Sequence, residues 1–263
     1  MTASARYGWL GGLLAVALGA AALAPPIPQD PAYHRMVDAR PLAGMPNAAN
    51  VLSNLPFVLV GAAGLLGLGP GRRGAWGIHF VDRRERWPYA VFFAGILLTG
   101  LGSAHYHWAP DNARLVWDRL PLAASMMGLF AGTIGDRLGA RAGLAALGPL
   151  VALGLASVLV WHAGEARGAG DLRLYALVQF FPLVAIPAMA LLFPPRYTRG
   201  ADLVIAAAIY GLAKLGEMLD AGIYALGGAV SGHTVKHLLA AAACGWIGWM
   251  LVRREPATAT GES

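Results

Sequence analysis

The sequence predicts an all-α fold: a polytopic membrane protein with a seven-helix bundle and one extra N-terminal helix. Its 263 residues are 57% hydrophobic and 13% charged, whereas a soluble domain has about 25% charged residues. Apolar runs long enough to cross a bilayer, which takes about 20 residues as a helix, recur along the whole chain. Together these observations exclude a soluble globular protein.

Eight apolar runs approach or meet this length. They cover residues 8–24, 48–69, 89–108, 115–135, 143–163, 172–193, 203–226 and 233–252. Prolines inside several of them are tolerated in membrane helices. The predicted organisation is an N-terminal transmembrane helix or signal peptide over residues 1–24, an outer loop over 25–47, a seven-helix membrane domain over 48–252 and a polar C-terminal tail over 253–263.

The first apolar run has two interpretations. Arg6, the short apolar stretch after it and the small residues Ala22 to Ala24 are typical of a cleaved signal peptide. Pro25 and Pro26 follow at once and argue against cleavage. We favour a retained helix, and both interpretations leave the other seven helices in the same orientation.

The net charge of +6 comes mainly from arginines in the loops between apolar runs. Such arginines orient a membrane protein with the richer side in the cytoplasm, so nucleic-acid binding is not expected. The poorer side holds Arg35, Arg40, Arg114, Arg167 and Arg173. The Ala-, Gly- and Arg-rich composition is typical of a bacterial protein. We therefore predict a multi-pass protein of the bacterial inner membrane, with both termini cytoplasmic if the first helix is retained.

Two polar stretches interrupt the apolar runs, GSAHYHWAPDNARLVWD at 102–118 and SGHTVKH at 231–237. Ser103 and His107 are four residues apart, as are His233 and His237, so each pair shares one helical face. With the orientation above, both stretches lie toward the outer, periplasmic leaflet. Three imidazoles with an open position are typical of catalytic zinc. The single cysteine, Cys244, excludes an intrachain disulfide and a thiolate cluster.

Other polar residues of these stretches have simpler interpretations. His105 is off the face shared by Ser103 and His107, and Asp111 is expected to be a turn residue. His79 and His162 are expected to be packing or interfacial residues. Asp118 has an alternative role as an ion-pair partner of Arg114 or Arg119, and Ser103 as a helix-packing serine that bonds to its own backbone.

A further polar group lies in the run 203–226, which contains Lys214, Glu217 and Asp220. Lys214 and Glu217 could neutralise each other at i,i+3 spacing. Asp220 would then orient a liganding histidine or pair with Lys236, or the group would only stabilise the bundle. Earlier in the chain, Asn47, Asn50 and Asn54 line one helical face, where hydrogen bonds between helices account for them.

These motifs resemble the alkaline ceramidase family, within the CREST superfamily of seven-helix membrane hydrolases and related receptors. The matching stretches are NVLSNLPF, GLGSAHYH followed by WDRLP, the region of Asp220, and SGHTVKH, which together extend from Asn47 to Val252. The resemblance implies a metal-dependent hydrolase of linear amide C–N bonds, which cleaves the N-acyl bond of ceramide-like lipids to a fatty acid and a long-chain amine.

Carried over by position, the resemblance assigns His107, His233 and His237 as zinc ligands. It assigns Asp118 to proton transfer and Ser103 to holding the water or the oxyanion. Eukaryotic members also have an acidic cluster that resembles a calcium site. Here Asn47 stands at the helix start and the loop before it offers only Asp30 and Asp38, so we do not transfer calcium binding.

Two other functions stay open at this stage. The first is a non-hydrolytic lipid-binding or receptor-like protein on the same scaffold. The second is a haem protein using paired histidines, although Ser103 and Asp118 would then have no role. The expected partners are the bilayer and a membrane lipid, either ceramide or another N-acyl lipid, because many bacteria make little sphingolipid. The sequence makes no prediction of oligomeric state.

Overall fold

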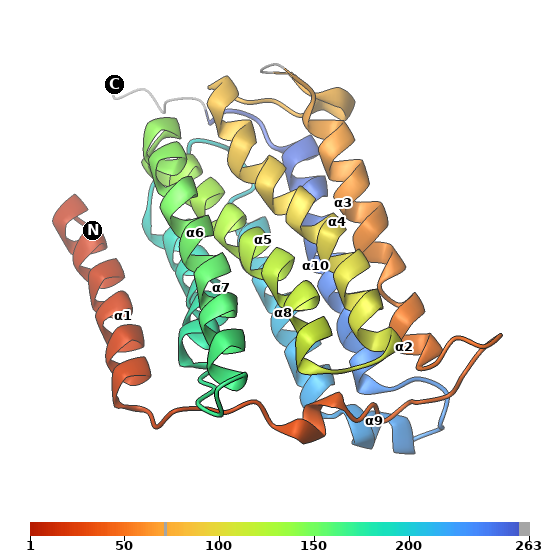
Figure 1. The fold of residues 1–263 in the computed structure, drawn as a ribbon. Coiled ribbons are helices and arrows are strands. Elements are labelled where there is room, and N and C mark those ends of the chain that lie inside the picture. Colours follow the sequence, from red (N-terminus) through yellow and green to blue (C-terminus); the bar gives the residue numbers. More distant parts are fainter. Residues whose placement is uncertain (71–72, 258–263) are drawn as a thin grey trace, which may run out of the picture.

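The fold is all-α in the computed structural model, as predicted. The structure describes residues 1–70 and 73–257, and within these ranges extended backbone pairs only as isolated bridges, never as a named strand. The long helices run side by side in one bundle (Figure 1). Arg72 and residues 258–263, which contributed to the predicted orientation and to the predicted tail, lie outside the described residues.

The helices follow the predicted apolar runs with two interruptions. In chain order they are α1 Ala3–Leu23, α2 Ala48–Leu52, α3 Leu55–Leu68, α4 Arg86–Trp108, α5 Asn112–Leu138, α6 Ala140–Glu165, α7 Arg173–Leu192, α8 Ala201–Met218, α9 Asp220–Ala225 and α10 Gly232–Arg253, with 3₁₀ turns at Pro31–His34, Ala75–Gly77 and Arg83–Glu85. The run 48–69 is divided before Pro56, whose missing N–H removes a helical hydrogen bond. The run 203–226 is divided at Leu219, whose ψ of 19° is not helical.

Six helical spans of the described chain are long and apolar enough to cross a membrane, which indicates a multi-pass membrane protein. They are Ala3–Leu23, Ala48–Leu68, Arg83–Trp108, Ala140–Glu165, Arg173–Leu192 and Gly232–Arg253. The other two predicted spans are the helices α5 and α8, which carry more ionisable side chains, among them Asp118 and Glu217. Ionisable residues of membrane helices usually face the bundle interior, and both of these side chains line an internal cavity.

Helix α1 stands at the edge of the bundle (Figure 1). All of Ala3–Leu23 is described and none of it is buried; its contacts are with α7 and the segment after it, including a Tyr7–Phe193 ring pair with centroids 5.3 Å apart. Helices α2 to α10 form the rest of the bundle. That α1 is retained and not cleaved as a signal peptide stays a prediction.

Glycines allow two close helix approaches that bring polar residues together. A Cβ at Gly102 of α4 would lie 1.9 Å from the carbonyl oxygen of Trp117 on α5, so the residues that follow, Ser103 and Asp118, are also held close. A Cβ at Gly232 would lie 2.1 Å from the carbonyl oxygen of Gly216. This second approach fixes the start of α10 against α8.

The segment between α1 and α2 crosses one end of the bundle, where α9 also lies (Figure 1). Two hydrogen bonds of His34 hold it, from Nδ1 to the Tyr106 hydroxyl at 3.0 Å and from Nε2 to the Asn112 side chain at 2.9 Å. The Asn50 side chain also donates to the carbonyl of Asp38 at 3.2 Å. The segment therefore covers the end of the bundle where α4 ends and α10 begins.

Candidate metal centre and lipid cavity

Three buried histidines meet at the covered end of the bundle, as predicted. His107 lies in the last turn of α4, and His233 and His237 lie in the first turns of α10. Their exposed fractions are 1%, 6% and 4%. One nitrogen from each ring lies within 4.8 Å of the others, so this group could hold a metal ion.

The imidazole nitrogens are arranged for a shared cation. Nε2 of His107 and Nε2 of His233 are 3.1 Å apart, and the three ring centroids are 4.7 to 4.9 Å apart. Nδ1 of His237 contacts the Ser53 hydroxyl at 2.8 Å, which orients the ring and leaves Nε2 available. Nδ1 of His107 is buried without a partner among the described residues. Two ring nitrogens that face each other at 3.1 Å in a buried site fit a metal ion held between the rings.

Lys236 would compete with a metal ion for one nitrogen of this histidine group. Its Nζ lies 3.0 Å from Nε2 of His233 and 2.8 Å from Oε1 of Glu217. An ammonium and a metal cannot use one lone pair together. Because Lys236 has Glu217 as a second partner and a flexible side chain, it can release His233 without becoming an unpaired charge.

The two predicted supporting residues, Asp220 and Lys236, both contact His233, but their contacts differ from the predicted ones. Asp220 accepts a hydrogen bond from the backbone N–H of His233 at 2.8 Å, so it fixes the start of α10 and not an imidazole ring. Lys236 pairs with Glu217 and not with Asp220. Lys214 also pairs with Glu217, as predicted. Two lysines from different helices therefore share one carboxylate, a pairing that the sequence spacing did not predict.

Ser103 and Asp118 meet beside the histidines. Ser103 is buried, and the close approach of α4 and α5 at Gly102 brings it near Asp118. The alternative of an ion pair with Arg114 or Arg119 is wrong: no basic side chain of the described residues lies within ion-pair distance of Asp118. Arg114 pairs with Asp111, which caps α5, and Arg119 donates to Gln29 at 2.7 Å.

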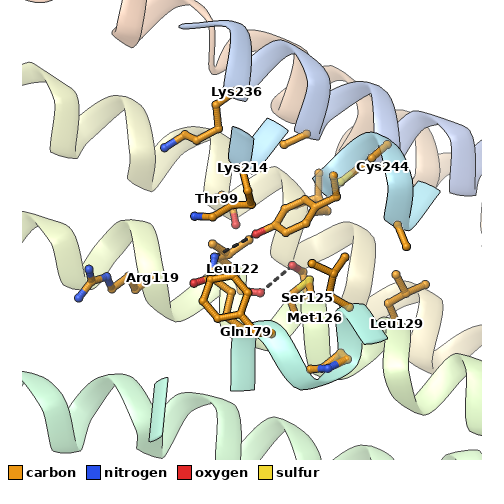
Figure 2. A pocket seen from close by; sticks show the side chains of 18 of the residues that line it. Thr99, Arg119, Leu122, Ser125, Met126, Leu129, Gln179, Lys214, Lys236 and Cys244 are labelled. Carbon is orange, nitrogen blue, oxygen red and sulfur yellow. Dashed lines mark hydrogen bonds between the residues drawn. The ribbon is translucent and has the colours of Figure 1, made fainter. Parts of the chain in front are cut away.

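Both groups open into a cavity of about 420 Å³, a volume in the range of small-molecule sites. Its polar end has Ser103, Asp118 and His237, and its remainder is mainly apolar. Figure 2 shows the nitrogen ends of Lys236, Lys214 and Arg119 on one side of the view, with Leu129 and Cys244 on the other. The cavity therefore has a charged end and an apolar end.

Side chains from the row of asparagines Asn47, Asn50 and Asn54 form hydrogen bonds at the same end of the bundle. Asn47 donates to the backbone carbonyl of His107 at 2.8 Å, and Thr234 donates to the Asn50 side chain at 3.1 Å. These contacts confirm hydrogen bonding between helices for Asn47 and Asn50, whereas the Asn54 side chain donates to the carbonyl of Asn50 in its own segment. In the loop before α2, Asp38 pairs with Arg40, whose hydrogen bonds hold the pKa of that carboxyl below its usual range.

Ser53 was not singled out from the sequence, although it holds His237. Its only signal was a small polar residue in the quoted motif NVLSNLPF. His105 is exposed on the far side of α4, as its position predicted. The fold and this site together define a class: polytopic α-helical membrane proteins with a buried three-histidine group. No protein-family model matches the chain, and no curated protein matches it either.

Proposed function

We propose that this protein is a zinc-dependent intramembrane amidase that hydrolyses the N-acyl bond of ceramide-like lipids. The carrying observation is a group of three buried histidines, one of which, His237, lines a largely apolar cavity together with Ser103 and Asp118. The resemblance to alkaline ceramidases supports the same proposal through residues at matching positions.

His107, His233 and His237 would hold the zinc, which when bound supplies a Lewis acid and lowers the pKa of its water. The choice of zinc follows from an all-imidazole set of three that leaves one position open. Ser53 keeps the ring of His237 in place through its 2.8 Å contact. Asn47 holds the backbone of His107.

Protein side chains carry out proton transfer, oxyanion stabilisation and binding of the acyl chain. The Asp118 carboxylate accepts the proton of the attacking water and returns it to the leaving amine nitrogen, acting as base and then acid. The Ser103 hydroxyl, which lines the same cavity as Asp118, can donate to the developing oxyanion. The apolar cavity wall binds the acyl chain and excludes bulk water. The products are a fatty acid and a long-chain amine.

We further propose that the site faces the outer leaflet of a bacterial inner membrane, with the termini on the cytoplasmic side. This proposal rests on the distribution of loop arginines along the sequence. The bundle end that carries the site is the one crossed by residues 25–47, which contain only two basic residues, Arg35 and Arg40.

One observation favours a second candidate, a non-hydrolytic lipid-binding or receptor-like protein on the same scaffold. The 3.0 Å contact between Lys236 and His233 engages a nitrogen that a metal would need. Such a protein would bind lipid in the cavity without cleaving it.

Purified protein incubated with a panel of N-acyl lipids, analysed by mass spectrometry, separates the two functions. The amidase proposal expects fatty-acid release by wild type and a loss of at least about 100-fold in Asp118→Asn, whose amide cannot accept the proton. His233→Ala should lose both zinc and activity. His105→Ala is the matched control, because it removes an exposed imidazole of α4. Full activity in His233→Ala would sink the proposal, and lipid binding without turnover by wild type would favour the second candidate.

A further inference from the structure

The polar end of the cavity carries more positive than negative charge. Glu217 accepts from Lys236 at 2.8 Å through one carboxylate oxygen and pairs with Lys214 through the other. All three side chains line the cavity. One carboxylate therefore serves two ammonium groups from two helices, α8 and α10.

The other charged side chains of the cavity wall do not correct this imbalance. Asp118 contributes one negative charge and Arg119 one positive charge. Arg119 is 6% exposed, its Nη1 has no hydrogen-bond partner among the described residues, and its Nη2 donates to the neutral Gln29. Its guanidinium lies over the rings of Trp161 and Tyr175, which carry no net charge. The lining residues thus sum to one surplus positive charge, before any metal is bound. An uncompensated charge in an apolar surrounding is costly unless an anion pairs with it.

The sequence uses lysine only here. Of 20 basic residues in the chain, 18 are arginines, and the two lysines are Lys214 and Lys236. A lysine is a compact charge with three rotatable donors on a flexible stem, whereas arginine is a planar fork. Two lysines in the wall of one cavity fit a small anionic group that enters and leaves.

The anion must lie close to the scissile bond. Nζ of Lys236 is 3.0 Å from Nε2 of His233, which belongs to the histidine group. An anion paired with Lys236 therefore lies within a few ångströms of the reacting amide. A carboxylate on the carbon next to the amide nitrogen satisfies this requirement, and a distant headgroup does not.

We propose that the preferred substrate is an N-acyl amino acid, whose α-carboxylate pairs with Lys214 and Lys236. This inference rests on the proposed amidase function and names its substrate class. Hydrolysis breaks the amide C–N bond; the hydroxyl of water goes to the acyl carbon and its proton to the nitrogen. The products are a fatty acid and a free amino acid. A ceramide, with neutral hydroxyls near its amide, leaves the surplus charge unpaired.

The test compares N-palmitoylglycine with N-palmitoylethanolamine, which differ in a carboxylate against a hydroxymethyl group. We expect wild type to prefer N-palmitoylglycine by about tenfold in kcat/KM, the worth of one charged hydrogen bond. Binding of both lipids to Asp118→Asn, measured without turnover, should favour N-palmitoylglycine at least as strongly, because this variant removes one negative charge from the cavity wall. Turnover of N-palmitoylethanolamine or ceramide as fast as N-palmitoylglycine would overturn the inference and leave the amidase function standing. Absence of all turnover with tighter N-palmitoylglycine binding would overturn the amidase function and the substrate assignment together, and would leave a carboxylate-binding cavity.

Two variants change the net charge of the cavity wall in opposite directions. Lys214→Met leaves Glu217 and Lys236 as a balanced pair, so the preference ratio should fall toward one. Glu217→Gln adds a net positive charge, so the ratio should rise. Arg167→Met is the matched control, because it removes a positive charge from an exposed loop, and its ratio should equal that of wild type. Equal ratios in Lys214→Met, Glu217→Gln and wild type, with zinc content retained, would also overturn the inference.

Discussion

The two ends of the bundle handle buried charge in different ways. At the end opposite the histidines, Asp136 accepts from Arg254 and from the Tyr89 hydroxyl, each at 2.6 Å. Arg196 and Tyr197 meet Glu85 in the same region. The space left there is about 10 Å³, roughly that of a single water. At the histidine end, ring nitrogens face one another and the space is about 420 Å³.

This difference separates stabilisation from function. Carboxylates at the closed end meet arginine and tyrosine, and Arg254 also lies 3.9 Å from the Tyr197 ring centroid. Those contacts tie α4, α5 and the end of α10 together. At the histidine end, three imidazoles that could hold a metal ion lie beside a cavity whose wall carries two lysines and two carboxylates. We expect substitutions at the two ends to have separable effects.

The largest expected effect on stability comes from Asp136→Asn at the closed end. The substitution leaves Arg254, which is 1% exposed, without its countercharge. Breaking a buried pair by removing one partner costs about 3–5 kcal/mol. Thermal unfolding in detergent should show a clearly lower Tm, while the folded fraction should keep its zinc. Loss of zinc at an unchanged Tm would contradict the separation of the two ends.

A smaller effect, on zinc affinity and not on stability, is expected from Ser53→Ala at the histidine end. The variant removes the 2.8 Å contact that orients the His237 ring. Loss of such a supporting contact typically weakens metal binding by about 10–100-fold. Competition with a zinc chelator should measure this change, with Tm of the zinc-free protein close to that of zinc-free wild type. Ser157→Ala, which removes a buried serine of α6 bonded to its own helix, is the control.

The smallest expected effect concerns Asp171, in the loop before α7. Hydrogen bonds from Arg173 lower the pKa of Asp171 to about 2. Because the folded-state pKa is depressed, the carboxylate stabilises the fold above its usual pKa, and this contribution is lost as the pH falls toward about 2. Asp171→Asn should therefore lower Tm slightly at pH 7, with the difference shrinking below about pH 4. A difference that grows on acidification would contradict the assignment.

Local sequence patterns were enough for the helices and for the members of the histidine group. The i,i+4 spacing of His233 and His237 fixed their common face, and the position of His107 in its apolar run fixed its depth. The apolar runs did not predict the interruptions at Ser53–Asn54 and Leu219, which depend on one proline and one local backbone angle.

Contacts between distant segments could not be read from spacing. Ser53 contacts His237, which lies 184 positions away in the sequence. Lys236 pairs with Glu217 of α8 because the close approach of Gly216 and Gly232 brings those helical turns together. Asp220 was expected beside an imidazole but lies beside a backbone N–H. Each of these contacts depends on how the helices pack. Residue spacing within one sequence does not reveal which side chains such packing brings together.

X-ray absorption at the zinc edge of purified wild-type protein tests the central claim most directly. The account predicts about one zinc per chain, with three imidazole nitrogens at about 2.0–2.1 Å and one further light ligand. A His105→Ala sample should give the same spectrum. Protein that hydrolyses N-acyl lipids while holding no zinc, or zinc bound by fewer than three imidazoles, would contradict the account.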